Sequence, residues 1–217
     1  MSEGPQAAGD EAVAKPKGGI LTGALWGVAV VGVAAVVYII AQSTTKTAPT
    51  VPTVPITAAP GGSPAAFAKK LTLATQPTPA PDYAFYDSAG KAVKIADLKG
   101  KVVVMNIWAT WCAPCVVEMP TLAKLQAAYV GKGVEVVAVS IDSPEAATKA
   151  RLFIARNAPL DFYHDREMKL PFRINAPGAP TTVIYGRDGL EKARLSGEAD
   201  WAGAEARALI DKVLAAG

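Results

Sequence analysis

The residues of this chain with the clearest capacity for covalent chemistry are its two cysteines, Cys112 and Cys115. They follow an apolar run at residues 102–108, and residues 116–129 carry apolar side chains at helical spacing. Cys112 is therefore expected at or just before a helix N-terminus, where unpaired backbone N–H groups and the helix dipole stabilise a thiolate. Because a thiolate is the nucleophile of disulfide exchange, the pair is interpreted as a redox-active dithiol.

Three simpler interpretations of the pair compete with this one. A structural zinc site needs about four soft ligands, and the chain offers two cysteines and a single histidine, His164. A structural disulfide that closes so short a loop would remove little unfolded-chain entropy, about 2 kcal/mol. Two inert buried cysteines are conceivable, but Pro114 between them suits the first turn of a helix, where no N–H donor is needed. The redox interpretation is favoured.

An uncharged apolar stretch at residues 20–41 is long enough to cross the roughly 30 Å hydrocarbon layer as a helix. It predicts a single transmembrane anchor after a short tail at residues 1–19. Lys15 and Lys17 directly precede the span and only Lys46 follows it closely, so the positive-inside tendency places the tail in the cytoplasm. The rest of the chain would then lie outside the cytoplasmic membrane, in an oxidising compartment such as a periplasm.

A cleaved signal peptide is the alternative for this stretch. Signal peptides have a shorter apolar region of about 7–15 residues, with small residues before the cleavage point. Ala41 would meet the second requirement, but Ile39 occupies the other recognition position and is poorly suited to it. An uncleaved anchor is therefore favoured.

The remainder of the chain divides into a linker and a domain. Residues 42–81 are rich in Thr, Ala and Pro and cannot bury a core, so they are interpreted as an extended, semi-rigid linker. Within it, residues 65–73 could form a short helical turn. Residues 82–217 have the size of one compact domain. The net charge of +3 is too small, and the lysines are too scattered, to indicate nucleic-acid binding.

Strands and helices alternate along residues 82–217. Runs such as 102–107 and 134–141 are apolar on both faces, which is typical of central strands covered by helices on either side, and the expected class is α/β. The predicted elements are a strand at 83–86, a turn at 88–90, strands at 102–108 and 135–141, helices at 113–129 and 144–157, a short segment at 161–163, a helical turn at 166–173, a hairpin of strands 181–185 and 190–195, and a helix at 201–215.

Residues 82–217 resemble the thioredoxin-fold oxidoreductases over nearly their whole length. The similarity rests on the sequence WCAPC after a central strand, on Pro120, and on the sequence GAPT at residues 178–181 before a hairpin. The segment NIWATWCAPCVVEMPTL is similar to membrane-anchored bacterial reductases of the TlpA, ResA and CcmG type. Near the C-terminus, the segment GEADWAGAEARALI resembles the TlpA members of this group most. The resemblance implies a thioredoxin fold, with a central mixed β-sheet flanked by helices, preceded by one transmembrane helix.

The resemblance also implies roles for the residues around the dithiol. Cys112 would be the exposed nucleophile and Cys115 the more buried resolving thiol, with no cofactor or metal besides this redox-active disulfide. Thioredoxin has a buried carboxylate at the position of Asn106, which cannot take a proton. Glu118, about one helical turn after Cys115, matches the glutamate of the extracytoplasmic reductases and would exchange protons with the cysteines. An ordinary solvated helix glutamate is the alternative.

A surface for the partner protein is implied beside the dithiol. Pro180 would be a cis proline next to the cysteines, with Ala179 and Thr181 as its neighbours. The backbone beside this proline would dock the partner chain, and Trp111 would shape the contact surface. Ala179 is smaller than the apolar residue common before this proline, which leaves less side chain to touch a partner. His164 is interpreted as a loop residue without a role.

The resulting hypothesis is a membrane-anchored, extracytoplasmic thiol–disulfide reductase, with the direction of electron flow taken from the family. TlpA-like proteins reduce the copper-site cysteines of cytochrome oxidase subunit II and of Sco-type copper chaperones, whereas the ResA and CcmG relatives reduce apocytochrome c for haem attachment. The C-terminal similarity favours the first set of partners. Re-reduction would need a membrane electron conduit of the DsbD or CcdA kind.

Two hypotheses from other classes remain. A copper-binding chaperone could use both cysteines and His164, but Sco-like sites space their cysteines by three residues instead of two. A thiol peroxidase could oxidise Cys112 to a sulfenic acid. The usual sequence setting of thioredoxin-fold peroxidases lacks this WCxPC pair, so negligible peroxide turnover is expected.

Overall fold

Two apolar strands, β4 (Val102–Trp108) and β5 (Val134–Ser140), form the middle of the fold and pair in parallel. The computed structural model describes residues 64–216, and all of β4 is buried. Neither face of this strand meets solvent because helices or loops cover both, which is why its sequence is apolar at consecutive rather than alternate positions. The C-terminal end of β4 leads directly to the two cysteines.

In the described part of the chain, eight strands form one sheet in the order β1-β8-β7-β4-β5-β6-β2-β3. Only the β4/β5 and β5/β6 pairs are parallel, and the other pairings are antiparallel, so the predicted mixed sheet is confirmed. The remaining strands are β1 (Leu71–Leu73), β2 (Phe85–Tyr86), β3 (Ala92–Val93), β6 (Tyr163–His164), β7 (Thr181–Tyr185) and β8 (Glu191–Ser196).

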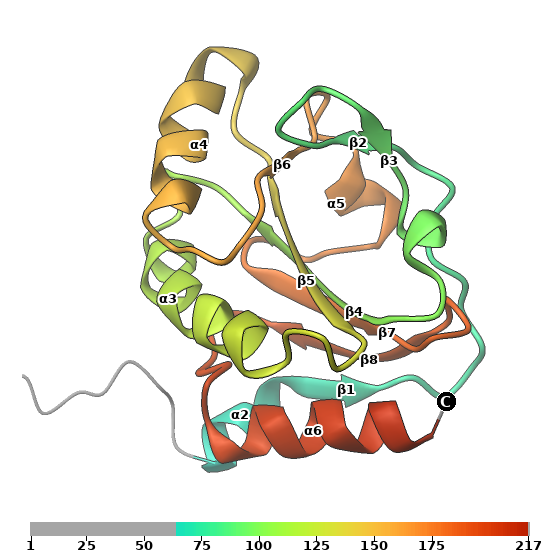
Figure 1. Cartoon of the computed structure of the whole chain (residues 1–217). Coiled ribbons are helices and arrows are strands. Elements are labelled where there is room, and N and C mark those ends of the chain that lie inside the picture. The colour runs from blue at the N-terminus through green and yellow to red at the C-terminus, as the bar shows by residue number, and fades with distance from the viewer. Residues whose placement is uncertain (1–63, 217) are drawn as a thin grey trace, which may run out of the picture. The chain divides into compact units, whose positions relative to one another are not determined.

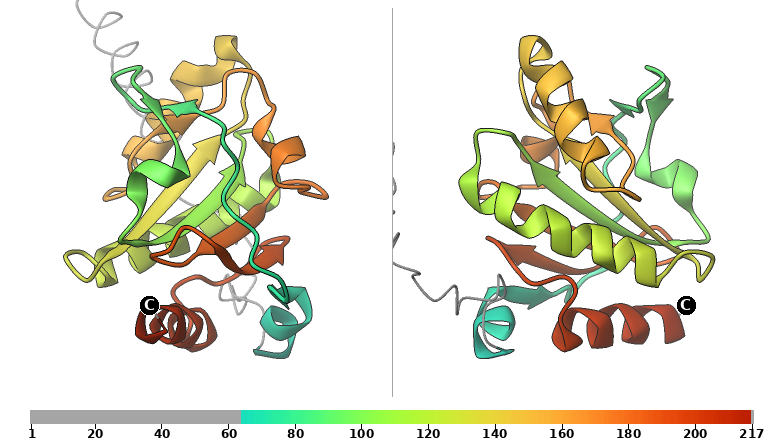
Figure 2. Two further views of the ribbon diagram at one scale, coloured as in Figure 1. Left: turned by 90° about the vertical axis from the view of Figure 1, so that its right-hand side faces the viewer. Right: turned by 60° about the vertical axis from the view of Figure 1, so that its left-hand side comes forward.

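Helices cover both faces of this sheet (Figures 1 and 2). α3 (Ala113–Ala128) connects β4 to β5, and α4 (Ala147–Ala155) connects β5 to β6. Both connections join neighbouring parallel strands in the same direction across the sheet, so right-handed crossovers place the two helices on one face. α6 (Ala204–Ala215) lies on that face too, and α5 (Leu170–Arg173) lies on the other. Cys112 therefore lies where the central strand meets its covering helix.

The folded part of the chain begins earlier than the predicted boundary at residue 82. Helix α2 (Pro64–Lys70) leads into β1, which pairs with β8 at one edge of the sheet. Phe67 is buried, and its ring meets that of Trp201 edge-on with 5.9 Å between centroids. The short helical turn expected within residues 65–73 is present as α2, but the pairing of β1 with β8 shows that residues 64–73 belong to the folded domain and not to the predicted linker. One aromatic anchor in a segment rich in Pro, Thr and Ala left little compositional signal for this.

Most other elements differ from expectation only at their ends. β4 and β7 have the predicted bounds, while the helix expected at 144–157 is a 3-10 turn, η2 (Pro144–Ala146), followed by α4. The helical turn expected from residue 166 starts only at Leu170, because Met168 has a positive φ of 51°. The last helix starts at Ala204 rather than at Trp201, because a turn precedes it in which the Gly203 N–H donates to the Asp200 carbonyl oxygen at 3.1 Å.

The transmembrane span predicted at residues 20–41 and the tail at 1–19 lie outside the described residues. Within residues 64–216, no helix combines the length and the apolar character needed to cross a bilayer.

Candidate active site

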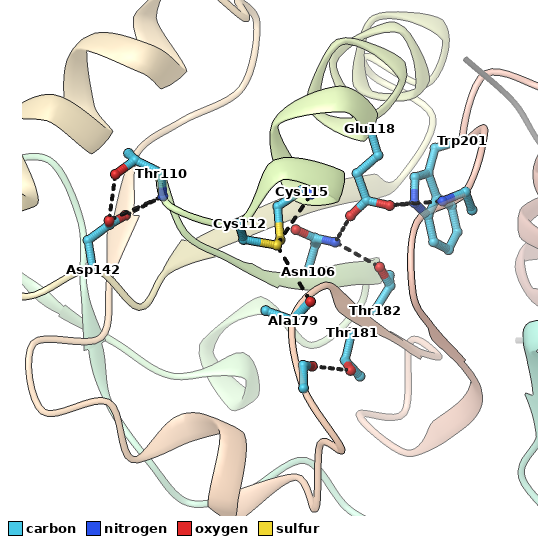
Figure 3. The surroundings of a disulfide bond; sticks show 12 residues. Asn106, Thr110, Cys112, Cys115, Glu118, Asp142, Ala179, Thr181, Thr182 and Trp201 are labelled. Atoms are coloured by element: carbon cyan, nitrogen blue, oxygen red, sulfur yellow. Dashed lines mark hydrogen bonds between the residues drawn. A yellow bond between two sulfur atoms is a disulfide. The ribbon is translucent and has the colours of Figure 1, made fainter. Parts of the chain in front are cut away.

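Cys112 and Cys115 are joined by a disulfide at the junction of β4 and α3 (Figure 3). The two sulfur atoms are 2.02 Å apart and the two Cα atoms 5.3 Å apart. Cys112 is the N-cap of α3, Pro114 lies in the first turn, and the backbone N–H of Cys115 points at Cys112 Sγ over 3.4 Å. After reduction, this N–H and the positive helix end would favour a thiolate at Cys112, as its position in the sequence predicts.

The two cysteines differ in their access to solvent. Cys112 keeps 5% of its surface exposed and Cys115 none, so a partner can reach only Cys112. This order of burial agrees with a nucleophilic Cys112 and a resolving Cys115. Cys112 is nevertheless more covered than the predicted exposed nucleophile, because the Ala179 carbonyl oxygen lies 3.5 Å from its sulfur.

The loop that precedes β7 lies against the disulfide. The Ala179–Pro180 peptide bond is cis, in agreement with the role expected of Pro180. Thr181 is fully buried, and its hydroxyl donates to the Gly178 carbonyl oxygen at 2.7 Å. The Thr181 side chain therefore holds the loop in place, and the docking of a partner on the backbone beside Pro180 stays a prediction. Ala179 is half-buried and stays within reach of a partner.

Trp111, directly before the first cysteine, is the exposed aromatic residue of the site. Its exposed fraction is 64%, whereas Trp108 on β4 is fully buried against Phe153 with 5.3 Å between ring centroids. Exposed aromatic side chains give large contact areas at low entropic cost. Trp111 is thus available for partner contact, and Trp108 belongs to the core.

Glu118 lies about one helical turn after Cys115, on the face of α3 that packs against β4 (Figure 3). Its exposed fraction is 2%, so the alternative of a solvated helix glutamate is wrong. The carboxylate accepts three hydrogen bonds, from Asn106 Nδ2 at 2.7 Å, Ala199 N at 3.0 Å and Trp201 Nε1 at 3.4 Å. Burial raises the pKa of Glu118 to about 7, although these donors oppose the shift. Near neutral pH the group can both accept and release a proton.

Asn106 occupies the β4 position at which thioredoxin has its carboxylate, and it is fully buried. Its amide nitrogen donates to Glu118 Oε1 at 2.7 Å and to Thr182 Oγ1 at 2.9 Å, so both amide hydrogens are used. Among the described residues, its Oδ1 has no hydrogen-bond partner. Asn106 therefore links β7 to Glu118 through its nitrogen and leaves an acceptor free.

Asp142, which the sequence reasoning missed, holds the loop that carries the cysteines. Its carboxylate accepts from the Thr110 backbone N–H at 3.0 and 3.1 Å and from the Thr110 hydroxyl at 2.7 Å (Figure 3). It also accepts from Ser140 Oγ at 2.8 Å. Asp142 is fully buried. The sequence signal that could have identified it is a carboxylate directly after an apolar strand, at the sheet edge where parallel strands end.

His164 is buried in β6, not placed in a loop as the sequence suggested. Its Nε2 lies 2.8 Å from the Asp142 carbonyl oxygen, which gives the ring a structural contact. Within residues 64–216, no group of three His, Cys, Asp or Glu side chains is arranged to hold a metal ion. The set of both cysteines and His164 that the copper-chaperone hypothesis requires is therefore not assembled.

Comparison with known proteins agrees with this geometry. The redoxin family matches residues 75–207, more than half of the chain, and the chain belongs to this family. The thiol-disulfide oxidoreductase ResA of Bacillus subtilis strain 168 is 33% identical over 132 residues, which cover 56% of this chain and 73% of that protein. ResA of Geobacillus thermodenitrificans is 33% identical over 136 residues, covering 60% and 74%.

Solved structures place the fold in the same group. A putative thiol:disulfide interchange protein DsbE from Chlorobium tepidum is 30% identical with a TM-score of 0.58, covering 66% of this chain and 99% of that one. A putative thioredoxin from Neisseria meningitidis is 29% identical with a TM-score of 0.54, covering 64% and 91%. Together with the disulfide at the start of α3, these similarities identify the protein as a thiol–disulfide oxidoreductase of the TlpA, ResA and CcmG type.

Proposed function

We propose that this protein is a membrane-anchored, extracytoplasmic reductant of disulfides in partner proteins. The observation that carries the exchange chemistry is the disulfide between the helix-capping Cys112 and Cys115, one turn before the buried Glu118, whose pKa of about 7 suits proton exchange at neutral pH. The direction of electron flow is taken from the resemblance to the TlpA, ResA and CcmG reductases. The anchor is the apolar stretch at residues 20–41, with its N-terminal side in the cytoplasm and the domain in the periplasm.

The reduced protein acts through two exchange steps. The Cys112 thiolate attacks one sulfur of the partner disulfide, which forms a mixed disulfide and releases the partner's other sulfur as a thiolate. Cys115 then loses its proton to Glu118 and attacks Cys112 Sγ, which frees the second partner thiol and leaves the Cys112–Cys115 disulfide. Two electrons pass from the dithiol to the partner, and the proton on Glu118 returns to solvent or to a partner thiolate.

The partners we favour are the copper-site cysteines of cytochrome oxidase subunit II and of a Sco-type copper chaperone. Support comes from the C-terminal segment GEADWAGAEARALI, which resembles TlpA and whose Ala199 and Trp201 donate to Glu118. Apocytochrome c, before haem attachment, is the alternative partner, supported by the relatives named ResA. A membrane protein of the DsbD or CcdA kind would return the protein to its dithiol form.

A competition experiment tests the choice of partner. The reduced full-length protein is mixed with the oxidised copper domain of subunit II, the oxidised Sco-type chaperone and an oxidised apocytochrome c peptide, each in turn. The proposal predicts that the first two are reduced at least ten times faster than the peptide. Faster reduction of the apocytochrome peptide would indicate that the protein acts in haem attachment instead. If none of the three substrates were reduced, a reductant role in either process would be excluded.

A further inference from the structure

One buried polar atom beside the disulfide is left without a partner. Asn106 is fully buried, and its Oδ1 accepts no hydrogen bond from the described residues. Buried carbonyl oxygens are nearly always satisfied in native proteins, because an unmade bond costs the desolvation of the group. The oxidised form shown in this structure therefore has an unfilled acceptor in the middle of its active site.

The two bonds made by the Asn106 nitrogen fix the direction of this acceptor. The nitrogen faces Glu118 at 2.7 Å and Thr182 at 2.9 Å, which turns the oxygen away from both. Cys115 and Glu118 are three residues apart on α3, so their side chains share the helix face that packs against β4. Figure 3 shows the Asn106 side chain beside the disulfide, with its nitrogen on the Glu118 side.

We propose that Asn106 is a positioning residue for the resolving thiol: in the reduced protein, Cys115 Sγ–H donates a hydrogen bond to Asn106 Oδ1. The donor exists only after reduction. A dithiol reductant breaks the Cys112–Cys115 bond, transfers two electrons and two protons, and is itself oxidised to a disulfide. One of those protons resides on Cys115 Sγ, and it fills the acceptor that the oxidised form leaves empty.

This bond would make the two cysteines unequal. Oδ1 can only accept, and the amide hydrogens are committed to Glu118 and Thr182, so Asn106 stabilises the Cys115 thiol and offers nothing to its thiolate. Cys112, at the start of α3, has the opposite environment. Cys112 is thus ionised while Cys115 stays protonated. Cys115 loses its proton only when Glu118, which is bonded to the nitrogen of the Asn106 amide, accepts it.

The bond would also shift the redox equilibrium. It stabilises the dithiol form and is lost on oxidation, so it makes the protein a weaker reductant than the same site without it. The inference rests on the thiol–disulfide exchange activity of the family and on the geometry around Asn106. It does not depend on the partners or on the direction of electron flow proposed above. The inference about Asn106 and the proposed function can therefore fail independently of each other.

Asn106→Leu is the variant that removes the acceptor while keeping the number and branching of the side-chain heavy atoms; it also removes the donor to Glu118, which the controls below address. The full-length protein is equilibrated with oxidised and reduced dithiothreitol, and the dithiol fraction is measured by thiol trapping. We expect the equilibrium to move toward the disulfide by a factor of about three to ten, where tenfold corresponds to about 30 mV. We also expect the pKa of Cys115, measured by thiolate absorbance in a Cys112→Ser background, to fall.

Two controls separate this effect from a general disturbance. Thr182→Val removes one partner of the amide nitrogen but leaves Oδ1 in place, and it should change the equilibrium less than twofold. In a Glu118→Gln background, Asn106→Leu should still shift the equilibrium, because the acceptor acts on Cys115 directly. An unchanged equilibrium in a folded Asn106→Leu protein, an equal shift in Thr182→Val, or loss of the shift in the Glu118→Gln background would each overturn the proposal.

A measurement without any change at position 106 covers the case in which Asn106→Leu does not fold. Infrared spectra of the reduced protein in the Cys112→Ser background report the S–H stretch of Cys115 alone. The proposal predicts an S–H band at lower frequency than that of a small-molecule thiol in an apolar solvent. A frequency equal to that of the free thiol would mean that Asn106 accepts no bond, and the proposal would be wrong.

Discussion

The backbone N–H of Ala199 donates to Glu118 Oε2 over 3.0 Å, although 81 residues separate the two positions. The segment between β8 and α6 therefore closes over the carboxyl of α3. Trp201 from the same segment adds a second donor at 3.4 Å, and its own ring is fully buried. Burial, to which this cover contributes, is the largest cause of the shift of the Glu118 pKa to about 7, and the Ala199 and Trp201 donors oppose it.

Glu118→Gln should slow the second exchange step. Gln cannot accept the proton of Cys115, and loss of a general base lowers the rate by about a hundredfold at the low end of the usual range. The measurement is the rate at which the reduced protein reduces glutathione disulfide between pH 5 and 9. The rate of the natural protein should rise as Glu118 deprotonates near pH 7, and the variant should lack this rise. Glu145→Gln, an exposed glutamate of η2, should leave the profile unchanged.

The same carboxyl should make folding stability depend on pH. Its folded pKa of about 7 lies above the ordinary value of 4.5, so the folded state holds the proton more tightly than the unfolded state does. The stabilisation is complete below about pH 4.5 and disappears as the pH rises to about 7, by about 3 kcal/mol. Urea unfolding of the oxidised protein checks this, and the difference from Glu118→Gln isolates the contribution. A difference that does not change with pH over this range would contradict the assigned pKa.

Phe67→Ala tests whether α2 belongs to the folded domain. Phe67 is 8% exposed and packs against Trp201, so its truncation should lower the free energy of unfolding by about 3 kcal/mol. Leu73→Ala in the adjoining strand is the matched control, because Leu73 is 54% exposed and should change stability by less than about 0.5 kcal/mol. Equal effects of the two substitutions would indicate that residues 64–73 are part of the linker and not of the folded domain.

Asp142→Ala should loosen the loop before the cysteines. The substitution leaves the Thr110 N–H and the Ser140 hydroxyl without their acceptor, which should lower the free energy of unfolding by about 3 kcal/mol. Asp142→Asn keeps one oxygen for Thr110 and should cost less. Asp161→Ala, at an exposed position, provides the baseline. If Asp142→Ala matched that baseline, the Thr110 contacts would have no energetic weight.

Trp111→Ala should separate recognition of proteins from the exchange chemistry. The ring is 64% exposed beside Cys112, so its loss should leave stability unchanged and reduce kcat/KM for a protein disulfide by about tenfold. Reduction of glutathione disulfide, which is too small to need the ring, should keep its rate. Phe172→Ala removes another exposed aromatic residue, on α5, and should affect neither substrate. A tenfold lower rate with glutathione disulfide would mean that Trp111 contributes to the exchange reaction and not only to the binding of proteins.

The parts of the fold that sequence reasoning predicted well are those fixed by local pattern. β4 has its predicted bounds because seven consecutive residues are buried, and α3 begins after Cys112 because Pro114 and the apolar spacing act within one turn. Residues 64–73 were misassigned because β1 is held by pairing with β8, a contact across the chain that composition does not report.

The site shows the same division. The reactive pair and the helix position of Glu118 are local properties, and both were predicted. The burial of Glu118, the buried Thr181 side chain and the Asp142 contacts depend on segments remote in sequence or on the packing around the loop, such as Ala199 for Glu118. The orientation of the Asn106 amide likewise follows from Glu118 and Thr182 acting together from α3 and β7.

The most direct test of the central claim, that the protein is a reductant, is the reduction potential of the Cys112–Cys115 couple. The full-length protein is equilibrated against glutathione and dithiothreitol buffers, and the dithiol fraction is read by thiol trapping. A potential near or below about −230 mV would place the couple among the reductants, as we predict. A potential near about −120 mV would make the protein a disulfide-forming oxidant and contradict the direction of electron flow proposed here.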